Sequence, residues 1–484
     1  MKKEKFLILF LFMFFTSFLT QQLLYSKNYK KSLPRPEKET IGQGHLFSLR
    51  HYPKFYGDKN TIIGKFDKRS YLTNNLSGLR DALYKHGIYL DATLFQFWGF
   101  NSTGGEKHGF FRYNGKAEYW LMFDIGKIGL WPRGAFLFHA ESSWTAKDSI
   151  NQDVGSLLDA NCESRIPVPN TLKTTLSEAV LLQFFGENFR IRVGKLDATG
   201  PLDGTNFANN ARFQFIYTGL VNNPIIFNFT SYTSLALLPI WRINKTNKLL
   251  FFIADAEGKA DESGFDTAFN GNTNYVLQYN FYQPFKKDLP GTYRFMYAYS
   301  KKPIKKYNID DRVLINSNVG LSNCITTTVI DEALTITKKC NNYAFLINFD
   351  QYVWKSDKNH LIEHRHFQPP VGVLLFGRLG WEPKDRNVID LFFSIGVGSY
   401  GVIKKRYYDQ WGIGYAATHI SCRLRNKLKK IGIYLHDFEH AVEAFYNAEI
   451  TPALHFTVNA QVIRPPLKSR GTAFLINTRL QADF

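Results

Sequence analysis

The sequence predicts an all-β protein, a transmembrane antiparallel β-barrel of about sixteen strands with a short N-terminal helix. Three observations predict this class. Aromatic residues make up 16% of the 484 residues, yet the mean hydropathy is only −0.24. Strand-like segments also alternate with turns from residue 88 to the last residue. Barrel strands alternate lipid-facing and lumen-facing side chains, which gives such a composition. A helical membrane protein would need apolar stretches of about 20 residues.

The N-terminus is predicted to be an export signal. Three lysines among the first five residues precede an apolar run over 6–19, which is short for a membrane span. We assign 1–26 to a signal peptide cleaved near Ser26, with an uncleaved anchor as the alternative. Residues 27–75 are basic and lack a sustained period, and we interpret them as a solvated periplasmic segment. An exported β-barrel is expected in the bacterial outer membrane.

One helix and sixteen strands account for the remaining residues, 76–484. The helix is predicted over 79–86, because Asn75 or Ser77 can cap its start and Gly87 follows its end. The predicted strands are 88–98, 113–124, 134–144, 173–185, 189–198, 231–242, 248–256, 273–283, 292–300, 342–354, 371–381, 388–398, 411–421, 437–448, 454–464 and 472–484. No long helical period interrupts them.

The connections between these strands fall into two alternating classes. Short ones include 186–187, 244–247 and 290–291, whereas long ones include 145–172 and 301–341. Short turns at one rim, long loops at the other and an even number of strands are typical of bacterial outer-membrane barrels.

The hairpin over 173–198 places two arginines on one face. A two-residue turn pairs Phe185 with Asn188, which puts Arg190 and Arg192 opposite a wholly apolar face. In a barrel the apolar face meets lipid and the arginines meet a water-filled lumen. In a soluble sandwich the same faces would be core and surface, so this hairpin alone does not distinguish the two folds.

The last strand favours the barrel. Its two faces are Phe474, Ile476, Thr478, Leu480, Ala482 and Phe484 on one side, and Leu475, Asn477, Arg479, Gln481 and Asp483 on the other. A soluble protein rarely finishes on a strand with an exposed phenylalanine, since termini fray. An aromatic residue in the girdle at the membrane interface explains this ending.

Segments in this order resemble the carbohydrate-selective porins of the OprB family. They are GLRDALYKHGIYLDA (78–92), YNGKAEYWLMFDIGKIGLWPRGAF (113–136), LSEAVLLQFFGENFRIRVGKLDA (176–198), YYDQWGIGYAATHIS (407–421) and HAVEAFYNAEITPALHFTVNAQVIRPP (440–466), followed by the strand that ends in phenylalanine. Their order is more specific than any single piece. The basic segment 27–75, the loop 301–341 and a lysine-rich surface depart from the family.

The resemblance implies a channel narrowed by an inward-folded third loop, here about 197–230. The candidate sugar-contacting residues are Asp197, Asp203, Asn206, Asn209, Asn210 and Arg212 in this loop, with Arg190 and Arg192 opposite. Sites for neutral polyols use paired donors and acceptors, since an unpaired partner costs about 1–3 kcal/mol. The alternative is that these residues only solvate the pore lining or an exposed loop.

Three further charged residues fall within the predicted strands. Asp91 shares a face with Tyr89 and Thr93, and because a carboxylate facing lipid is costly we expect Asp91 in the lumen, as a further constriction residue. Glu178 and Lys195 fall on the nominally outward face. Either both lie beyond the hydrocarbon region, or a bulge turns them inward.

Neither catalysis nor a cofactor is predicted. HExxH, GxSxG and Walker A motifs are absent from the sequence. The GVGSYG run over 396–401 has the spacing of a dinucleotide-binding motif, but no helix is predicted after it, and we interpret it as a turn. His360, His364 and His366 lack a cysteine or carboxylate framework, so no metal site is expected.

The cysteines allow one disulfide within a single exported loop. Cys324 and Cys340 both fall in 301–341, and a bond between them is chemically permitted in an oxidising compartment. Free thiols are the alternative.

We therefore expect an outer-membrane porin for passive diffusion of small solutes, with carbohydrates as the expected solutes. The net charge of +19, or +17 without residues 1–26, would favour anions if it lined the lumen, so an anion-preferring general porin is one alternative. A non-conducting adhesin or structural barrel and a secreted β-sandwich enzyme are the others. The expected partners are small sugars or other small hydrophilic solutes and outer-membrane lipid, with a homo-oligomer left open. Nucleic acid is not expected, because no binding module is recognisable.

Overall fold

The computed structural model describes residue 69 and residues 71–145, 149–167, 172–268, 270–283, 289–305, 339–356 and 370–484. The predicted signal peptide over 1–26 lies outside the described residues, as does nearly all of the basic segment 27–75. So do Cys324, the side chain of Cys340, and the three histidines between 360 and 366. Among the described residues, no helix has both the length and the apolar character needed to cross a membrane.

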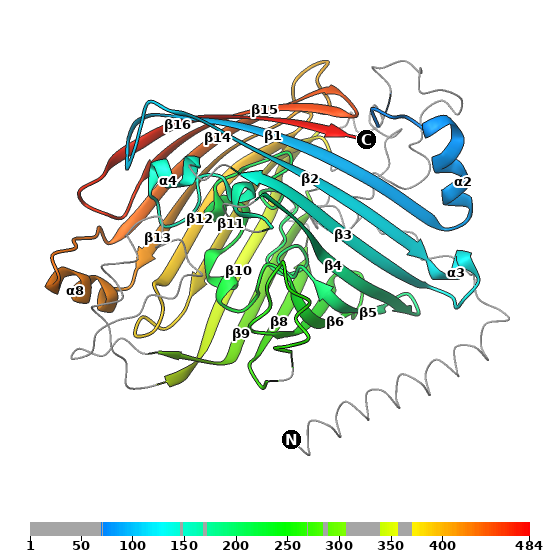
Figure 1. The fold of residues 1–484 in the computed structure, drawn as a ribbon, viewed down its shortest axis with the longest axis horizontal. Coiled ribbons are helices and arrows are strands. Elements are labelled where there is room, and N and C mark those ends of the chain that lie inside the picture. Colours follow the sequence, from blue (N-terminus) through cyan, green and yellow to red (C-terminus); the bar gives the residue numbers. More distant parts are fainter. Residues whose placement is uncertain are drawn as a thin grey trace.

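Sixteen strands within the described residues form one closed antiparallel barrel, in which each strand pairs with its neighbours in sequence and β16 pairs with β1 (Figure 1). The strands are β1 (Ile88–Gly105), β2 (Phe111–Asp124), β3 (Gly134–Thr145), β4 (Leu172–Phe185), β5 (Phe189–Leu196), β6 (Ser234–Arg242), β7 (Asn247–Asp255), β8 (Thr273–Tyr282), β9 (Gly291–Lys305), β10 (Lys339–Lys355), β11 (Gly372–Trp381), β12 (Ile389–Tyr400), β13 (Gln410–Ile420), β14 (Phe438–Thr451), β15 (Leu454–Arg464) and β16 (Gly471–Asp483). Closure leaves no sheet edge unpaired. The predicted fold class is confirmed.

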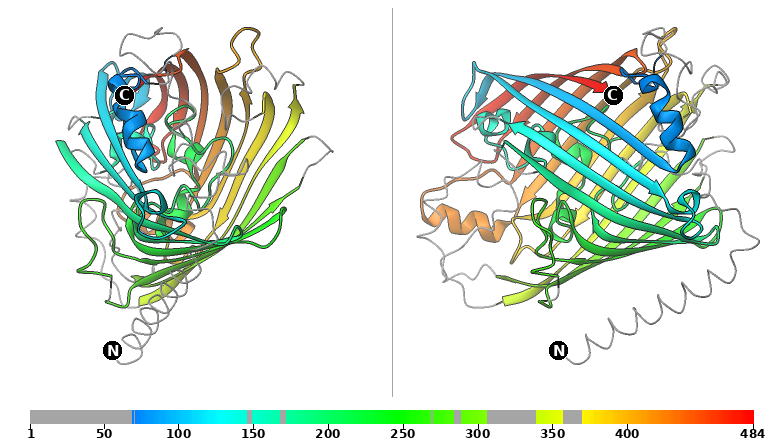
Figure 2. Two further views of the ribbon diagram at one scale, coloured as in Figure 1. Left: turned by 90° about the vertical axis from the view of Figure 1, so that its right-hand side faces the viewer. Right: turned by 45° about the vertical axis from the view of Figure 1, so that its right-hand side comes forward.

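The short helices lie at the two ends of the barrel and in its connections. They are η5 (Leu76–Gly78), α2 (Leu79–Lys85), α3 (Ile125–Ile128), α4 (Ile150–Val154), η6 (Cys162–Arg165), α5 (Thr218–Val221), η7 (Pro224–Asn228) and α8 (Cys422–Lys430). Helices α2 and α3 lie at the end with the short turns, and α8 lies at the opposite end (Figures 1 and 2). No long helical period was predicted after residue 88, and the described residues contain none, but the short, nine-residue α8 was not foreseen.

Alternation along the strands divides lipid-facing from lumen-facing side chains. In β16, Leu475, Asn477 and Arg479 are buried, whereas Phe474 and Ile476 are 40% and 46% exposed. Both faces agree with the sequence prediction. The GVGSYG run was predicted to be a turn, and this is wrong, because Gly396 to Tyr400 lie within β12.

The register of the β4–β5 hairpin differs from the prediction by one residue. Phe185 pairs with Phe189 rather than with Asn188, because the turn has three residues and begins at Gly186 with φ of +74°. Arg190 and Arg192 still face the lumen, since they pair with the buried Ile240 and Leu238 of β6. Their partners on β4, Phe184 and Leu182, share this face.

Glu178 faces inward, because it is in phase with the buried Val180 on β4, and a bulge in β4 lies directly before it. His139 pairs with Glu178 and the next residue of β3 pairs with Leu176, which leaves Ser177 extra. Lys195 instead stays at the rim, where its Nζ donates to the carbonyl oxygens of Ala260 at 2.6 Å and Glu262 at 2.8 Å. Glu178 therefore faces inward, whereas Lys195 lies at the rim.

Candidate functional site

Two connections lie inside the barrel. One is the described part of the β3–β4 connection, 149–167, and the other is the β5–β6 connection, 197–233, which we call the constriction loop. In the constriction loop Leu202, Phe207 and Ile225 are fully buried. Figure 2 shows the green segments within the ring of strands. The inward-folded loop that the resemblance implied is present.

An ion pair joins the constriction loop to the wall at β11. Arg378 Nε lies 3.1 Å from Asp203 Oδ2, and neither side chain is exposed. Asn348 Nδ2 donates to Asp203 Oδ1 at 2.8 Å, and the backbone N–H of Asn223 donates to Oδ2 at 2.7 Å. Arg378 also donates to the carbonyl oxygens of Ala208 and other loop residues. Both oxygens of Asp203 are thus engaged within the protein.

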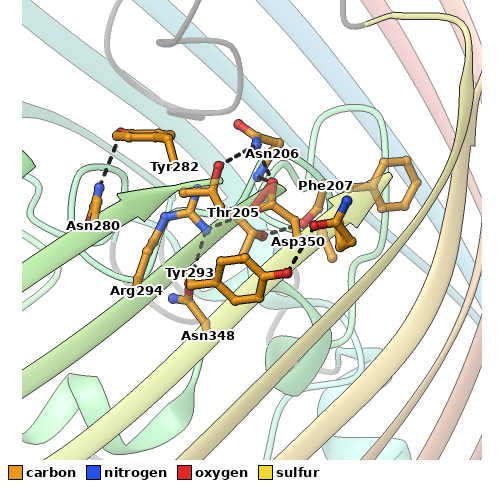
Figure 3. A network of polar contacts seen from close by, with 12 residues as sticks. Thr205, Asn206, Phe207, Asn280, Tyr282, Tyr293, Arg294, Asn348 and Asp350 are labelled. Carbon is orange, nitrogen blue, oxygen red and sulfur yellow. Dashed lines mark hydrogen bonds and ion pairs between the residues drawn. The ribbon is translucent and has the colours of Figure 1, made fainter. Parts of the chain in front are cut away.

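A polar network extends this anchor to β8, β9 and β10 (Figure 3). Arg294 Nη1 donates to Asp350 Oδ2 at 2.6 Å and to Asn348 Oδ1 at 3.1 Å. Asn206 of the constriction loop donates to the same Asp350, from both its side chain and its backbone. Asn280 Nδ2 points to the Tyr282 hydroxyl at 3.4 Å. One carboxylate therefore holds a wall arginine and the loop together.

Phenylalanine rings of the constriction loop pack against glycines and phenylalanines of the barrel wall. Phe207 and Phe215 of the loop contact Phe376 of β11 and Phe445 of β14. A Cβ at Gly398 would lie 2.1 Å from the Phe207 ring, so the ring occupies the space that a side chain would fill. This contact places the loop against the β11–β14 side of the barrel.

Wall side chains also bind the backbone of both inward connections. Glu443 of β14 accepts the N–H groups of Ile216 at 2.9 Å and Tyr217 at 2.8 Å. Glu439 of the same strand accepts the N–H groups of two residues in the β3–β4 connection. Arg479 of β16 donates to the carbonyl oxygens of Ala211 and Gln214. The backbone of the inward connections is therefore held by the C-terminal strands.

A buried charge cluster holds the other side of the constriction loop. Arg212 pairs with Glu118 of β2. Lys116 Nζ lies 2.9 Å from Glu118, 2.6 Å from Glu141 and 2.9 Å from Glu163. Ligand atoms of Glu118, His139 and Glu141 lie within 4.8 Å of one another, a spacing that could hold a metal ion. The Lys116 ammonium already provides a cation for both of these carboxylates.

A row of cations lines the wall on the β5–β9 side. Arg190 and Arg192 of β5 face the lumen, and Lys248, Asn280 and Arg294 are directly paired across β7, β8 and β9. Arg192 is 5% exposed and Lys248 is 6% exposed. Arg190 Nε and Arg192 Nε and Nη1 find no hydrogen-bond partner in the part of the chain that the structure describes.

Aromatic rings accompany these cations. The Arg190 guanidinium lies 5.7 Å from the Phe184 ring centre, and Lys248 Nζ lies 5.5 Å from that of Tyr282. Within the described residues no carboxylate lies within 4.0 Å of Arg190, Arg192 or Lys248, whereas Arg294 pairs with Asp350. On this wall, the described residues therefore leave nitrogens of Arg190 and Arg192 without a hydrogen-bond partner.

The remaining predicted residues lie at separate places. Asp91 faces inward on β1 and is 5% exposed, as expected. Asp197 follows β5, and its Oδ1 accepts both the N–H and the hydroxyl of Thr199 at 2.7 Å. Burial, together with Glu178, raises the pKa of Asp197 to about 7. Asn209 Nδ2 donates to the Val221 carbonyl at 3.1 Å within the loop.

Sequence reasoning missed the wall residues that hold the loop. Arg378, Glu443 and Lys116 were not singled out, although each is a charged residue on the inward face of a predicted strand. Alternating glycines at 396, 398, 412 and 414 were a further signal, because glycine on one strand face marks a close approach of other groups.

The comparisons with known proteins agree with this architecture. The family model described as carbohydrate-selective porin, OprB family, matches residues 112–484. The high-pH structure of Pseudomonas putida OprB covers 88% of this chain and 100% of its own, with a TM-score of 0.70 and 17% identity. Its low-pH structure covers 86% and 98%, with a TM-score of 0.51 and 15% identity. No match is found among curated proteins.

At such identities the likeness to the solved structures shows the fold, whereas the family match extends over most of the chain. It covers β2 to β16 and both inward connections. The chain therefore belongs to the OprB family of carbohydrate-selective porins, and is an outer-membrane channel rather than an enzyme.

Proposed function

We propose that sugars diffuse passively along the β5–β9 side of the lumen, in contact with Arg190, Arg192 and Lys248. The constriction loop supports this path, because Asp203, Phe207 and the backbone near Ile216 are bound at β11 to β14. The described residues of the loop provide no hydrogen-bond partner for the unpartnered nitrogens of Arg190 and Arg192.

The unpartnered guanidinium nitrogens of Arg190 and Arg192 carry the proposal. A sugar hydroxyl is a neutral acceptor that these donors can bind, and a hydrogen bond to a charged group contributes about 1.5–3 kcal/mol. The rings of Phe184 and Tyr282 provide the apolar surface that a sugar ring face needs. The cations lie on strands, so their positions are fixed by register rather than by loop conformation.

In this proposal the other predicted residues position the loop. Asp203 and Arg212 are engaged in ion pairs, and Asn209 donates within the loop. We propose that they set the width of the passage and leave direct contact to the β5 arginines.

Planar-bilayer conductance of the refolded protein tests the proposal, with glucose titrated as a blocker. We expect Arg190→Ala with Arg192→Ala to weaken glucose block about tenfold or more, since two charge-assisted donors are lost. Lys245→Ala is the matched control, because Lys245 is exposed in the β6–β7 turn. Block by phosphate and not by glucose would identify an anion-preferring porin instead, and equal glucose block in all three proteins would refute the contact.

A further inference from the structure

An exposed basic surface lies at the extracellular rim, outside the lumen. It consists of residues from the β13–β14 and β15–β16 connections, which we call the basic rim patch: Arg423, Lys429, Lys430, Tyr434, Arg464 and Lys468, all of which are exposed. Between them the two segments 422–437 and 464–470 contain eight lysines and arginines and one acidic residue, Asp437. Asp437 pairs with Arg425 of α8, and Arg470 pairs with Glu106, which follows β1, so six of the eight cations remain outside these two ion pairs. The patch therefore carries a large excess of positive charge.

The two connections are joined to each other, which gathers their cations in one place. Lys468 N–H donates to the Tyr434 carbonyl at 3.0 Å, and His436 N–H donates to the Pro466 carbonyl at 2.7 Å. Leu435 and Leu467 form an isolated bridge between the same segments.

Helix α8 is oriented by its apolar side. Leu424 and Leu428 are buried, so that Arg423, Lys429 and Lys430 are left on the exposed side. The helix projects beyond the end of β13, at the end of the barrel opposite α2 and α3 (Figure 1).

The position of Arg464 on β15 shows where the patch lies relative to the lipid-facing band of the barrel. It is the next outward-facing residue of β15 after Phe456, Val458 and Val462, which are 36%, 42% and 41% exposed. Its cross-strand neighbour on β14 is His440. The apolar, lipid-facing band therefore ends one residue pair below Arg464, which is where the headgroups of the outer leaflet begin.

The Arg464 guanidinium is held at this position by a neighbouring ring. Its Nη2 lies 3.2 Å from His436 Nδ1. Burial, with the charges of Arg464 and Lys468, lowers the pKa of His436, so the ring is uncharged at neutral pH. Because a guanidinium has no acceptor, the ring nitrogen accepts from Arg464. The Arg464 side chain is otherwise exposed.

We propose that the basic rim patch binds the phosphate groups of a phosphorylated glycolipid in the outer leaflet. Lysine and arginine at a membrane surface each contribute measurably to binding anionic lipid, and guanidinium groups match phosphate geometry. The exposed side chains of Tyr434 and Ile431, 51% and 43%, lie beside these cations, where an amphipathic ring suits the membrane interface. This binding is independent of transport through the lumen.

Native mass spectrometry of the detergent-solubilised full chain tests the proposal, with bis-phosphorylated lipid A as the probe. We expect Arg464→Gln with Lys468→Gln to raise the apparent Kd for lipid A about tenfold or more. The matched control is Lys404→Gln with Lys405→Gln, two exposed lysines in the β12–β13 turn at the other end of the barrel, and its Kd should be unchanged. Chemically dephosphorylated lipid A should bind all three proteins equally weakly.

Unchanged lipid A binding in the rim variant would overturn the proposal, as would equal loss in the control or equal affinity for dephosphorylated lipid A. Glucose-blocked conductance of the rim variant, which should match that of the wild type, separates this result from any failure of the pore proposal. If the double variant does not fold, Lys468→Gln alone carries the test, with an expected loss of about threefold or more.

Discussion

Arg378 on β11 and Asp203 in the constriction loop form an ion pair, with Nε 3.1 Å from Oδ2. Both side chains are fully excluded from solvent. The residues are 175 positions apart in the sequence. Desolvating two charges is costly, and such a pair contributes only when further hydrogen bonds satisfy both groups. Here loop carbonyl oxygens accept further hydrogen bonds from the Arg378 guanidinium, and Asn348 donates to the Asp203 carboxylate. The ion pair therefore helps to hold the constriction loop against β11.

Replacing Arg378 by methionine should release the loop. The change leaves Asp203 buried without its counter-ion, and breaking a buried pair in this way costs about 3–5 kcal/mol. We expect larger and noisier single-channel conductance and weaker discrimination between glucose and a disaccharide. Planar-bilayer recordings provide the measurement.

The double variant Arg378→Met with Asp203→Leu is the control for this change, because it removes both charges. It should recover part of the stability lost in the single variant. Equal instability of the two variants would show that the charge of Asp203 is not the cause.

Gly398→Ala should disturb the seat of Phe207. The added Cβ would lie 2.1 Å from a ring that is already enclosed by Phe215, Phe376 and Phe445. Overpacking of this kind costs about 1–3 kcal/mol. Thermal unfolding followed by the mobility shift of folded barrels on gels should show a lower midpoint. Adding Phe207→Leu should restore the midpoint, and a wild-type midpoint in Gly398→Ala alone would contradict the tight contact.

Lys116→Met should destabilise the barrel in a pH-dependent way. The substitution leaves the carboxylates of Glu118, Glu141 and Glu163 close together without the shared ammonium, at a cost of about 3–5 kcal/mol near neutral pH. Acid should relieve the defect, because protonation removes the repulsion. Lys173→Met, which breaks a partly exposed pair with Asp261, is the control and should cost less than about 1 kcal/mol. A pH-independent defect in Lys116→Met would point to lost packing instead.

Asp197 should make stability fall as pH rises. Its pKa of about 7 in the folded protein lies above the ordinary value of 3.8, so the folded chain holds a proton that the unfolded chain releases. Stability should therefore decline between about pH 4 and pH 7, by roughly 2–4 kcal/mol from this group. Asp197→Asn keeps an acceptor for Thr199 and should flatten the decline in unfolding midpoint. An unchanged pH profile in Asp197→Asn would contradict the shift.

The strands were predictable because their signal is local. Alternation within each segment gave the barrel and the inward faces of Asp91, Arg190 and Arg479. Capping residues and Gly87 gave the short helix before β1. The register of the β4–β5 hairpin was wrong because a turn of two residues and one of three, at Gly186, fit the same letters. Helix α8 was missed because its apolar side consists of only Leu424 and Leu428.

The partners within the lumen were not predictable from local pattern. Arg212 was expected to contact sugar, and it pairs with Glu118, 94 residues earlier. Which carboxylate meets which cation depends on how the barrel closes, and no period within a strand contains that information. The strand pattern located the loop as a long connection, but its inward folding was inferred only from the resemblance.

Arg479 and Glu443 link the position of the constriction loop to the closure of the barrel. Both belong to the last three strands, and both bind the backbone of a loop that lies more than two hundred residues earlier in the chain. A barrel that lacked these strands would therefore keep the loop contacts to β10, β11 and β12 but lose those that hold the backbone of residues 211–217. The full set of contacts that fixes the width of the passage is therefore complete only when β14 to β16 close against β1.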